Sequence, residues 1–439
     1  MWCSMALKPT VIIALILVVV VVAGLLYWYF VMMPSTPTTE IPDKITVGLT
    51  LGLSGAYSYA SHQGLWGIQA AIKWVNDVYG GIKIGNKAVK IELKYYDDQS
   101  NKELVSSLYE QLINVDKVDF LLGPYGSPLV MVAAPVAARY NKTMINWMGT
   151  GDVIHEQGYK NLVMVSTHSS YQMRSAINMI KTLDPNATIA VIFKEDEHNR
   201  YLARGALDEA RKLGLSVVFN KSYPIDIRDF TPIFTEMAAK KPDVIIICPH
   251  EADGILAAQQ LAELNINAKL MIMGFVPSLK SFRDALGNLA EGWAGTNQWT
   301  YGASYTPDDA QALGYEWFGP TEDKFLELYN QVADPGQFPS EHAGAGAAAI
   351  LVLARAIEKA QSLDQSAVRS ALNTMKLATF YGLYQIDPIT GKQIAHIEIL
   401  SQWQGGKFVA IWPPEIATSQ PVYPIPTWDE KRQGAQALP

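Results

Sequence analysis

The chain has 439 residues, of which 49% are hydrophobic and 18% are charged. Its length exceeds the size at which one hydrophobic core usually stops growing, so we expect two lobes or domains. The 35 basic and 42 acidic side chains give a net charge of −7 without any basic cluster, which argues against a nucleic-acid partner. The two cysteines, Cys3 and Cys248, provide neither a disulfide framework nor a cysteine-rich zinc site.

The N-terminal region contains an apolar run without charges over residues 10–33. A helix of that length exceeds the roughly 30 Å hydrocarbon core of a bilayer, so the run predicts one transmembrane helix. A cleavable signal peptide is the alternative, although its apolar core should have only about 7 to 15 residues. Aromatic residues at 27–30 favour a permanent anchor at the membrane interface.

The charges beside this run predict its orientation. Lys8 precedes the run, whereas Glu40 and Asp43 follow it before the next cation. By the positive-inside tendency we expect residues 1–9 in the cytoplasm and the remainder on the extracytoplasmic face of the cell membrane. The Pro/Thr-rich residues 34–43 are typical of an extended tether.

After the tether, short β-rich runs alternate with helical patterns. A second series begins at Ala187 and repeats the first: residues 119–124 and 243–249 both contain an Asp, an apolar run and a Pro. This alternation predicts an α/β fold of two Rossmann-like lobes with parallel-rich sheets. The alternative is an accidental echo, since any parallel strand gives an apolar run.

Loops at the carboxyl ends of the expected strands are the candidate ligand site, because open α/β sheets bind ligands there, near helix N-termini. Two facing lobes would close on a small molecule about a hinge. Ser127 stands at an expected helix N-cap and Pro128 at the first helical position. The candidate residues in the loops of the first series are Ser54, Tyr57, Tyr59, Tyr125, Ser127, Met148, Gly149 and Thr150.

The loops of the second series supply His198, His250 and Phe275, and a further aromatic candidate is Trp299. The aromatic side chains would tolerate an apolar, planar or cationic group. Charge runs are usually solvated, so we expect the carboxylates of residues 195–199 and 249–253 to have structural roles rather than ligand contacts.

Evidence for catalysis is weak in the sequence. The histidines form no His-x-x-x-His pair, and no Gly-x-Ser-x-Gly elbow is present. Residues 344–348 superficially resemble a dinucleotide loop, but they lie inside a helical pattern over 341–360 and predict a packing face of small residues. We therefore expect no catalytic residue, no metal and no cofactor.

Several motifs in a fixed order resemble the branched-chain amino acid and amide type of solute-binding protein. The motifs are Leu53–Gly55, Val75–Asp77 with Gly80–Ile82, Tyr96–Gln99, and Gly123–Pro124 with Ser127. The resemblance covers residues 45–415 and implies a type I periplasmic-binding fold, with two lobes joined by three crossing segments. We place lobe 1 in residues 44–166 and 298–378, lobe 2 in 167–297 and 379–412, and a C-terminal extension in 413–439.

The resemblance also implies roles for residues. Ser127, Thr150 and backbone groups around Met148 match positions that hold a ligand carboxylate or amide. Tyr57 and Tyr59 fall on the loop that covers the pocket, and His198 and His250 fall near positions that are usually aromatic.

One position departs from the family pattern. Val276 occupies a place where members that bind amino acids often have a Glu that pairs with the ligand ammonium. Because an unpaired buried ammonium is unfavourable by several kcal/mol, either Glu251 or Asp253 takes this role or the ligand lacks the cation.

These observations predict the binding component of an ABC importer, which captures a small polar solute such as an amino acid, an amide or a urea-like compound. Its expected partners are a permease and an ATPase. A ligand-sensing ectodomain that acts through a separate signalling partner is the first alternative, and an amidase-like hydrolase is the second.

Overall fold

The computed structural model describes residues 9–32 and 41–438, apart from the side chains of residues 9, 11–16 and 29–32. The chain divides into two compact units, Met1–Pro42 and Asp43–Pro439. Helix α1 (Pro9–Met32) of the first unit covers nearly all of the predicted transmembrane run. No helix in the described part of the chain is long and apolar enough to cross a membrane, so the structure does not support the predicted anchor. The predicted cytoplasmic end and tether lie almost entirely outside the described residues.

The first lobe of the second unit contains a six-stranded sheet with the order β2-β3-β1-β4-β5-β6. The sheet is parallel except for β2, which pairs antiparallel with β3. In central strand β1 the side chains of Ile45, Val47 and Leu49 are fully buried, as expected for a parallel strand covered by helices. The strands are β1 (Lys44–Leu51), β2 (Ile82–Ile84), β3 (Lys87–Asp97), β4 (Phe120–Leu122), β5 (Met144–Asn146) and β6 (Leu162–Met164).

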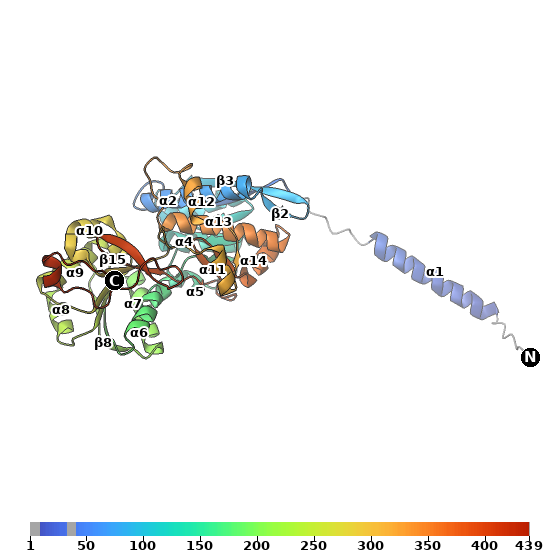
Figure 1. Ribbon diagram of the computed structural model, residues 1–439. Helices are drawn as coiled ribbons and strands as arrows, with labels where there is room; N and C mark the ends of the chain where they lie inside the picture. The colour runs from blue at the N-terminus through green and yellow to red at the C-terminus, as the bar shows by residue number, and fades with distance from the viewer. Residues whose placement is uncertain (1–8, 33–40, 439) are drawn as a thin grey trace, which may run out of the picture. The chain divides into compact units, whose positions relative to one another are not determined.

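Two helix pairs pack against this sheet: α2 (Ser58–Lys73) with α13 (Glu341–Ala360), and α3 (Lys102–Asn114) with α4 (Ser127–Arg139) (Figure 1). Glycines allow α2 and α13 to approach closely, since a Cβ added at Gly67 would lie 1.9 Å from the carbonyl oxygen of Ala343. This confirms the predicted packing face of small residues. Helices α5 (Asp152–Glu156), α11 (Pro307–Leu313), α12 (Glu322–Tyr329) and α14 (Gln365–Thr374) complete the set for this lobe.

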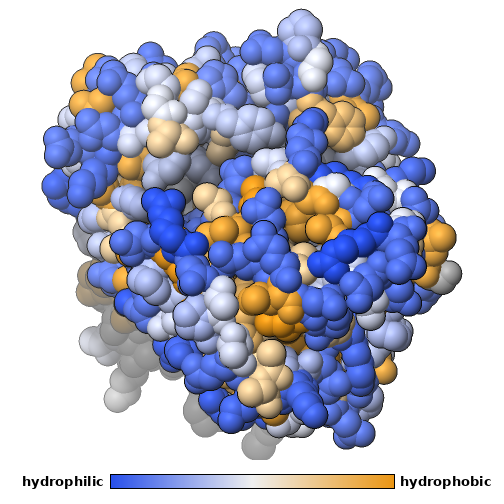
Figure 2. All heavy atoms as spheres, turned by 90° about the vertical axis from the view of Figure 1, so that its left-hand side faces the viewer, coloured by the Kyte–Doolittle hydropathy of each residue, from blue (hydrophilic) through white to orange (hydrophobic). Residues whose placement is uncertain are grey.

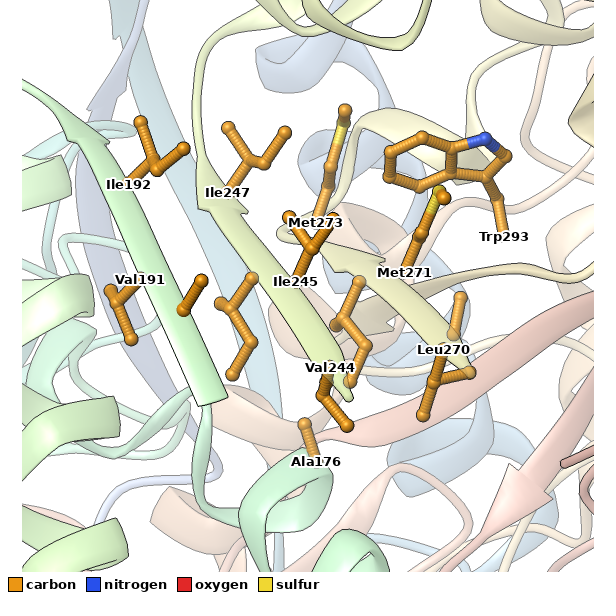
Figure 3. Close-up of a cluster of buried hydrophobic side chains, with 14 of the residues drawn as sticks. Ala176, Val191, Ile192, Val244, Ile245, Ile247, Leu270, Met271, Met273 and Trp293 are labelled. Atoms are coloured by element: carbon orange, nitrogen blue, oxygen red, sulfur yellow. The ribbon is translucent and has the colours of Figure 1, made fainter. Parts of the chain in front are cut away.

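The second lobe contains a seven-stranded sheet with the order β16-β15-β11-β10-β9-β7-β8. Strands β7 to β11 are parallel, and β15 and β16 are antiparallel. Figure 3 shows its core, where apolar side chains such as Ile245 of β9 and Met271 of β10 lie near Trp293 of β11. The strands are β7 (Thr188–Lys194), β8 (Ser216–Tyr223), β9 (Val244–Cys248), β10 (Leu270–Met273), β11 (Trp293–Asn297), β15 (Ile399–Gln404) and β16 (Lys407–Trp412).

The C-terminal segment packs on the second lobe. Its short helix α15 (Trp428–Arg432) inserts Trp428 into the core, where the ring centroid lies 6.4 Å from that of Trp293. The other helices of this lobe are α6 (Arg174–Leu183), α7 (Glu197–Lys212), α8 (Thr231–Ala238), α9 (Glu251–Glu263) and α10 (Lys280–Leu286). On the face shown in Figure 2, hydrophilic side chains dominate and apolar ones form separate patches.

Within residues 41–438 the chain passes between the two lobes three times, as the resemblance implies. The first two crossings are residues 165–173 and 298–306. The expected third boundary, at residue 379, falls inside a hairpin, because β13 (Leu377–Thr379) pairs antiparallel with β14 (Gly382–Tyr384) next to β12 (Glu316–Trp317). The third crossing therefore lies later, in residues 385–398.

Candidate ligand-binding site

A cavity of about 560 Å³ is lined by residues from both lobes. Its walls come from loops at the carboxyl ends of β4 and β5 in the first sheet, and of β7, β9 and β10 in the second. This is the edge at which open α/β sheets bind ligands. The strand ends of the two lobes thus share one cavity, as the sequence predicts. The lining residues from these loops include Tyr125, Ser127, Met148, Thr150, Asp196, His198, His250, Gly274 and Phe275.

The first-lobe wall presents hydroxyl and backbone groups. Gly126, with a φ of 89°, makes the turn before α4, so this helix begins at Ser127. Ser127 is therefore not the N-cap that the sequence predicts, and its Oγ instead accepts a hydrogen bond from the backbone N–H of Gly151 at 2.8 Å. That bond leaves the hydroxyl hydrogen of Ser127 available to a ligand oxygen. The neighbouring Thr150 also lines the cavity.

Aromatic rings border this hydroxyl wall. The ring centroids of Tyr57 and Tyr125 lie 5.5 Å apart in an edge-on arrangement, and both residues line the cavity together with Phe275 of the second lobe. Tyr125 is held by His342, whose Nε2 lies 3.1 Å from the phenol oxygen. Burial lowers the pKa of His342 to about 4, so this imidazole is neutral at pH 7.

The second-lobe wall contains two histidines and an aspartate. His250 Nε2 lies 3.1 Å from Asp196 Oδ2, and the Asp196 side chain caps α7 by accepting from the backbone N–H of Asn199 at 2.9 Å. Burial alone would raise the pKa of Asp196, but the hydrogen bonds from His250 and Asn199 hold it well below its usual range. Burial lowers the pKa of His198 to about 4, and its Nδ1 lies 2.9 Å from Ser169 Oγ.

Gln298 connects the crossing segments at the base of the cavity. Its Oε1 accepts from the backbone N–H of Thr167 at 2.8 Å, and its Nε2 donates to the Thr167 carbonyl at 2.9 Å, which joins the first and second crossings. The same Nε2 donates to Glu398 Oε1 of the third crossing at 2.7 Å. The backbone N–H of Gln298 donates to Glu341 Oε2 at 2.8 Å. Both glutamates line the cavity.

Both carboxyl groups at the base have raised pKa values. Burial raises the pKa of Glu341 to about 7, against a smaller lowering by the Gln298 hydrogen bond. Burial also raises the pKa of Glu398 well above its usual range, and the neighbouring Glu341 adds to this while Thr296 opposes it. These raised pKa values favour protonation of the pair near neutral pH.

Comparisons with known proteins agree with this geometry. The family of periplasmic binding proteins matches residues 44–407. The chain belongs to the periplasmic binding protein family. Among curated relatives, the Leu/Ile/Val-binding protein homolog 7 of Brucella suis biovar 1 is 23% identical over 392 residues, which cover 86% of this chain and 93% of the relative. The resemblance inferred from the motifs is confirmed.

Solved structures share the fold of this periplasmic binding protein. A branched-chain amino acid transporter substrate-binding protein from Streptococcus pneumoniae, in complex with isoleucine, has a TM-score of 0.60 at 18% identity and covers 83% of this chain and 97% of its own. A solute-binding protein of an ABC transporter from Rhodopseudomonas palustris HaA2, in complex with p-hydroxybenzoic acid, has a TM-score of 0.64 at 20% identity and covers 84% and 95%. These likenesses confirm the type I architecture.

Four residues predicted for the binding site do not line the cavity. The Ser54 hydroxyl donates to Asp97 Oδ2 at 2.8 Å on the exposed side of the loop. Tyr59 lies in the first turn of α2 and is 65% exposed. The remaining two, Gly149 and Trp299, are buried within the first lobe.

Local packing explains the positions of these two residues. The backbone N–H of Gly149 donates to Asn146 Oδ1 at 2.7 Å, which closes the loop on itself. Trp299 is 2% exposed and packs edge-on against Phe325 and Phe380. Its aromatic ring therefore belongs to the core of the lobe and not to the cavity wall.

Neither acid considered as a substitute for the missing Glu at Val276 lines the cavity. Lys194 Nζ donates to Asp253 Oδ1 at 2.7 Å, and the Tyr223 hydroxyl donates to Asp253 Oδ2 at 2.6 Å. Glu251 is exposed and accepts from Ser281. The carboxylates of residues 249–253 thus make structural contacts, as expected. In residues 195–199, Asp196 also has the expected structural role as the cap of α7, but Asp196 and Glu197 both line the cavity as well.

Sequence reasoning missed the base of the cavity. Glu341 begins a helix whose pattern predicts packing only, and Glu398 lies in a crossing segment without a motif. The available signal is the missing acid at Val276, which indicates that another carboxyl is needed but not where it lies. Further lining residues that the prediction omitted are Gly126, Pro128, Gly151, Gln172, Leu202, Pro249, Thr296, Gln298 and His342. Among the described residues, no group of three or more His, Cys, Asp or Glu side chains is placed to hold a metal ion.

Proposed function

We propose that this periplasmic binding protein captures a small polar solute in the cavity between its lobes and delivers it to the permease of an ABC importer driven by an ATPase subunit. The solute is an amino acid or a related amide or urea-like compound. The observation that carries the proposal is the cavity itself, since about 560 Å³ lies within the usual range for small-molecule sites and its polar groups converge from both lobes.

Ligand capture follows from the contacts on the two sides. A ligand carboxylate or amide oxygen accepts from the Ser127 hydroxyl beside Thr150, while Tyr57, Tyr125 and Phe275 enclose its apolar part. Contacts from both lobes favour the closed arrangement by the difference in ligand affinity between the open and closed states. The closed form is the one that a permease would recognise.

A thermal-shift screen of the purified full-length chain tests the proposal. Its arms are amino acids, their amides, urea, aliphatic amines and 4-hydroxybenzoate. A ligand present at 100 times its dissociation constant stabilises the folded state by about 2.7 kcal/mol. If no arm raises the melting temperature, solute capture by this cavity is disproved.

The Ser127→Ala variant tests the position of the ligand. We expect about tenfold weaker binding with an unchanged fold, since one hydrogen bond contributes about 1 to 1.5 kcal/mol. Ser107→Ala is the matched control, because Ser107 is an exposed helical serine outside the cavity wall. Equal affinities of the two variants would remove Ser127 from the site.

The location outside the cytoplasm is also a proposal, supported by the charge pattern around residues 10–33. Protease treatment of intact cells or spheroplasts should degrade the binding unit. Protection from protease would contradict the location.

A further inference from the structure

The charge of the cavity wall is one-sided. The carboxyl groups of Asp196, Glu197, Glu341 and Glu398 line it, whereas none of the described lining residues is a lysine or an arginine. Asp196 is paired with His250, and Glu197 is exposed at the start of α7. Glu341 and Glu398 have no Lys or Arg partner among the described residues. The described wall therefore lacks a Lys or Arg side chain to pair with an anionic ligand. It does contain carboxyl groups without a basic partner, which could pair with a cationic ligand.

Hydrogen bonds to Gln298 hold both glutamates in place. Glu398 is 3% exposed, and one of its oxygens is bound to the Gln298 side chain. Glu341 is bound through one oxygen to the backbone N–H of the same residue. These bonds use Oε1 of Glu398 and Oε2 of Glu341, and the Thr296 side chain also bonds to Glu398. Glu341 Oε1 remains for a ligand, and each Glu398 oxygen can accept a second hydrogen bond. Burying two acids beside each other is unfavourable unless a positive charge or a proton lies between them.

We propose that Glu341 and Glu398, held by Gln298, bind a protonated amine of the solute and replace the second-lobe acid that is missing at Val276. This inference rests on the proposed function, because it assigns the ligand class of the same cavity. The solute is then an amine-bearing compound, with any carboxylate or amide at Ser127 and its ammonium at the base between the crossing segments.

Binding of the amine also displaces a proton. Before a ligand binds, the raised pKa values of both acids favour protonation of the pair near neutral pH. An ammonium beside the pair favours ionisation of Glu341, so the proton of this carboxyl group passes to solvent as the ligand enters. One carboxylate then balances the ammonium, and the more strongly raised pKa of Glu398 favours its protonated form. Affinity therefore rises as pH increases, by up to about tenfold per pH unit below pH 7, and levels off above pH 7.

We assign the pH dependence in this range to the two acids and not to the groups around them. Burial lowers the pKa of His342, beside Glu341 on α13, and of His396, in the third crossing, to about 4. Burial raises the pKa of Tyr125 and Tyr381, so both phenols stay neutral. On the second-lobe side, His198 is neutral as well, and His250 is paired with Asp196.

Calorimetry with matched probes tests the inference on the full-length chain. The probes are L-leucine, its deaminated analogue 4-methylpentanoate, 3-methylbutylamine, and 4-hydroxybenzoate. We expect each probe that binds to carry an amine, and we expect proton release when titrations at pH 7 are compared in two buffers of different ionisation enthalpy. Glu341→Gln and Glu398→Gln should each weaken binding at least tenfold, and Glu341→Gln should also abolish the proton release.

Glu322→Gln is the matched control. Burial raises the pKa of Glu322 as well, but its carboxylate accepts from Ser304 at 2.6 Å outside the cavity, so this variant should bind as the native chain does. Circular dichroism checks that each glutamine variant folds. If one variant does not fold, the other still tests the inference.

The outcomes separate the two proposals. If 4-hydroxybenzoate or 4-methylpentanoate binds, with affinity that falls as pH rises, the protonated pair donates to an anion; the amine inference is then wrong and solute capture stands. If an amine binds but both glutamine variants keep its affinity, the inference is also wrong. If neither these probes nor the wider screen yields a ligand, the proposed function fails with it.

Discussion

The hydroxyl wall of the first lobe and the pair of glutamates at the bottom of the cavity differ in charge and in how the fold positions them. Ser127 and Thr150 lie in loops that directly follow strands, so their positions depend on local turns and on one helix start. Glu341 and Glu398 come from segments that are far apart in the sequence and meet only through Gln298. A wall of neutral donors can accept many oxygen-bearing ligands, whereas a fixed pair of acids selects by charge. On the proposed amine site, the charge of the ligand is selected where the lobes join.

Removal of Gln298 should have the largest effect. Gln298→Ala deletes side-chain hydrogen bonds to Thr167 and Glu398, each with buried partners. Unsatisfied buried groups are unfavourable by about 1–3 kcal/mol each, so we expect a loss of several kcal/mol in unfolding free energy and about 100-fold weaker ligand binding. Urea denaturation and calorimetry measure the two effects. Native-like stability and affinity would show that the crossings are held by other contacts.

The two walls should differ in their response to pH. Ser127→Ala removes a neutral donor, so it should lower affinity about tenfold at every pH and keep the slope of the pH profile. Glu341→Gln removes a titrating group and should flatten the profile between pH 6 and 8. Affinity measured at intervals of half a pH unit distinguishes the two responses. Parallel profiles for both variants would contradict the assignment of charge selection to the base.

Stability of the empty protein should show two opposing pH effects. Burial lowers the pKa of His342 and His396 to about 4, so their contribution is present above the unfolded value of about 6.5 and is lost as pH falls towards 4. Burial raises the pKa of Glu341 to about 7, so its contribution is present below its ordinary value of about 4.5 and is lost as pH rises through 7. Relative to the native chain, Glu341→Gln should therefore gain melting temperature at pH 8 and not at pH 5. A constant difference across this range would argue against a buried acidic pair.

The smallest effect is expected at Tyr59. This side chain is 65% exposed and does not line the cavity, so Tyr59→Ala should leave affinity unchanged within twofold. Tyr57→Ala, on the neighbouring cavity-lining residue, should weaken binding several-fold by loss of ring contact. Calorimetry on both variants checks the contrast, and a matching loss in the two would restore Tyr59 to the site.

The sequence predicts the fold well because both sheets depend on local periodicity. Apolar runs such as 243–249 identify parallel strands, and the order of the two series predicts the two lobes. The third crossing was misplaced because pairing of β14 with β13 depends on contacts that no run of residues displays. Ser-Pro is a common helix start and therefore predicts Ser127 as the cap, but Gly126, whose positive φ makes the turn, is the actual N-cap and shifts that position by one residue.

Sequence reasoning places a residue in the cavity wall correctly where the residue directly follows a strand, and incorrectly where its position depends on contacts between distant segments. Ser127, Thr150 and His250 line the cavity because the loop after a parallel strand has little choice of direction. Trp299 and Tyr59 are aromatic residues near such loops, but neither lines the cavity. Trp299 packs in the core of the lobe, and Tyr59 lies on the exposed surface of a helix. The acids of the base could not be found, since their proximity requires all three crossings to be in place.

The close fit of α2 against α13 has a consequence for how the protein is made. The apolar side of α2, near the start of the binding unit, is covered by a helix that begins only at Glu341, and this helix comes so close to Gly67 that a Cβ there would collide with the Ala343 carbonyl. Likewise, the second sheet receives β15 and β16 only from residues 399–412. Neither half of the molecule can therefore be completed while the ribosome is still translating its middle. The growing chain must be kept from aggregating until nearly all of it has been synthesised.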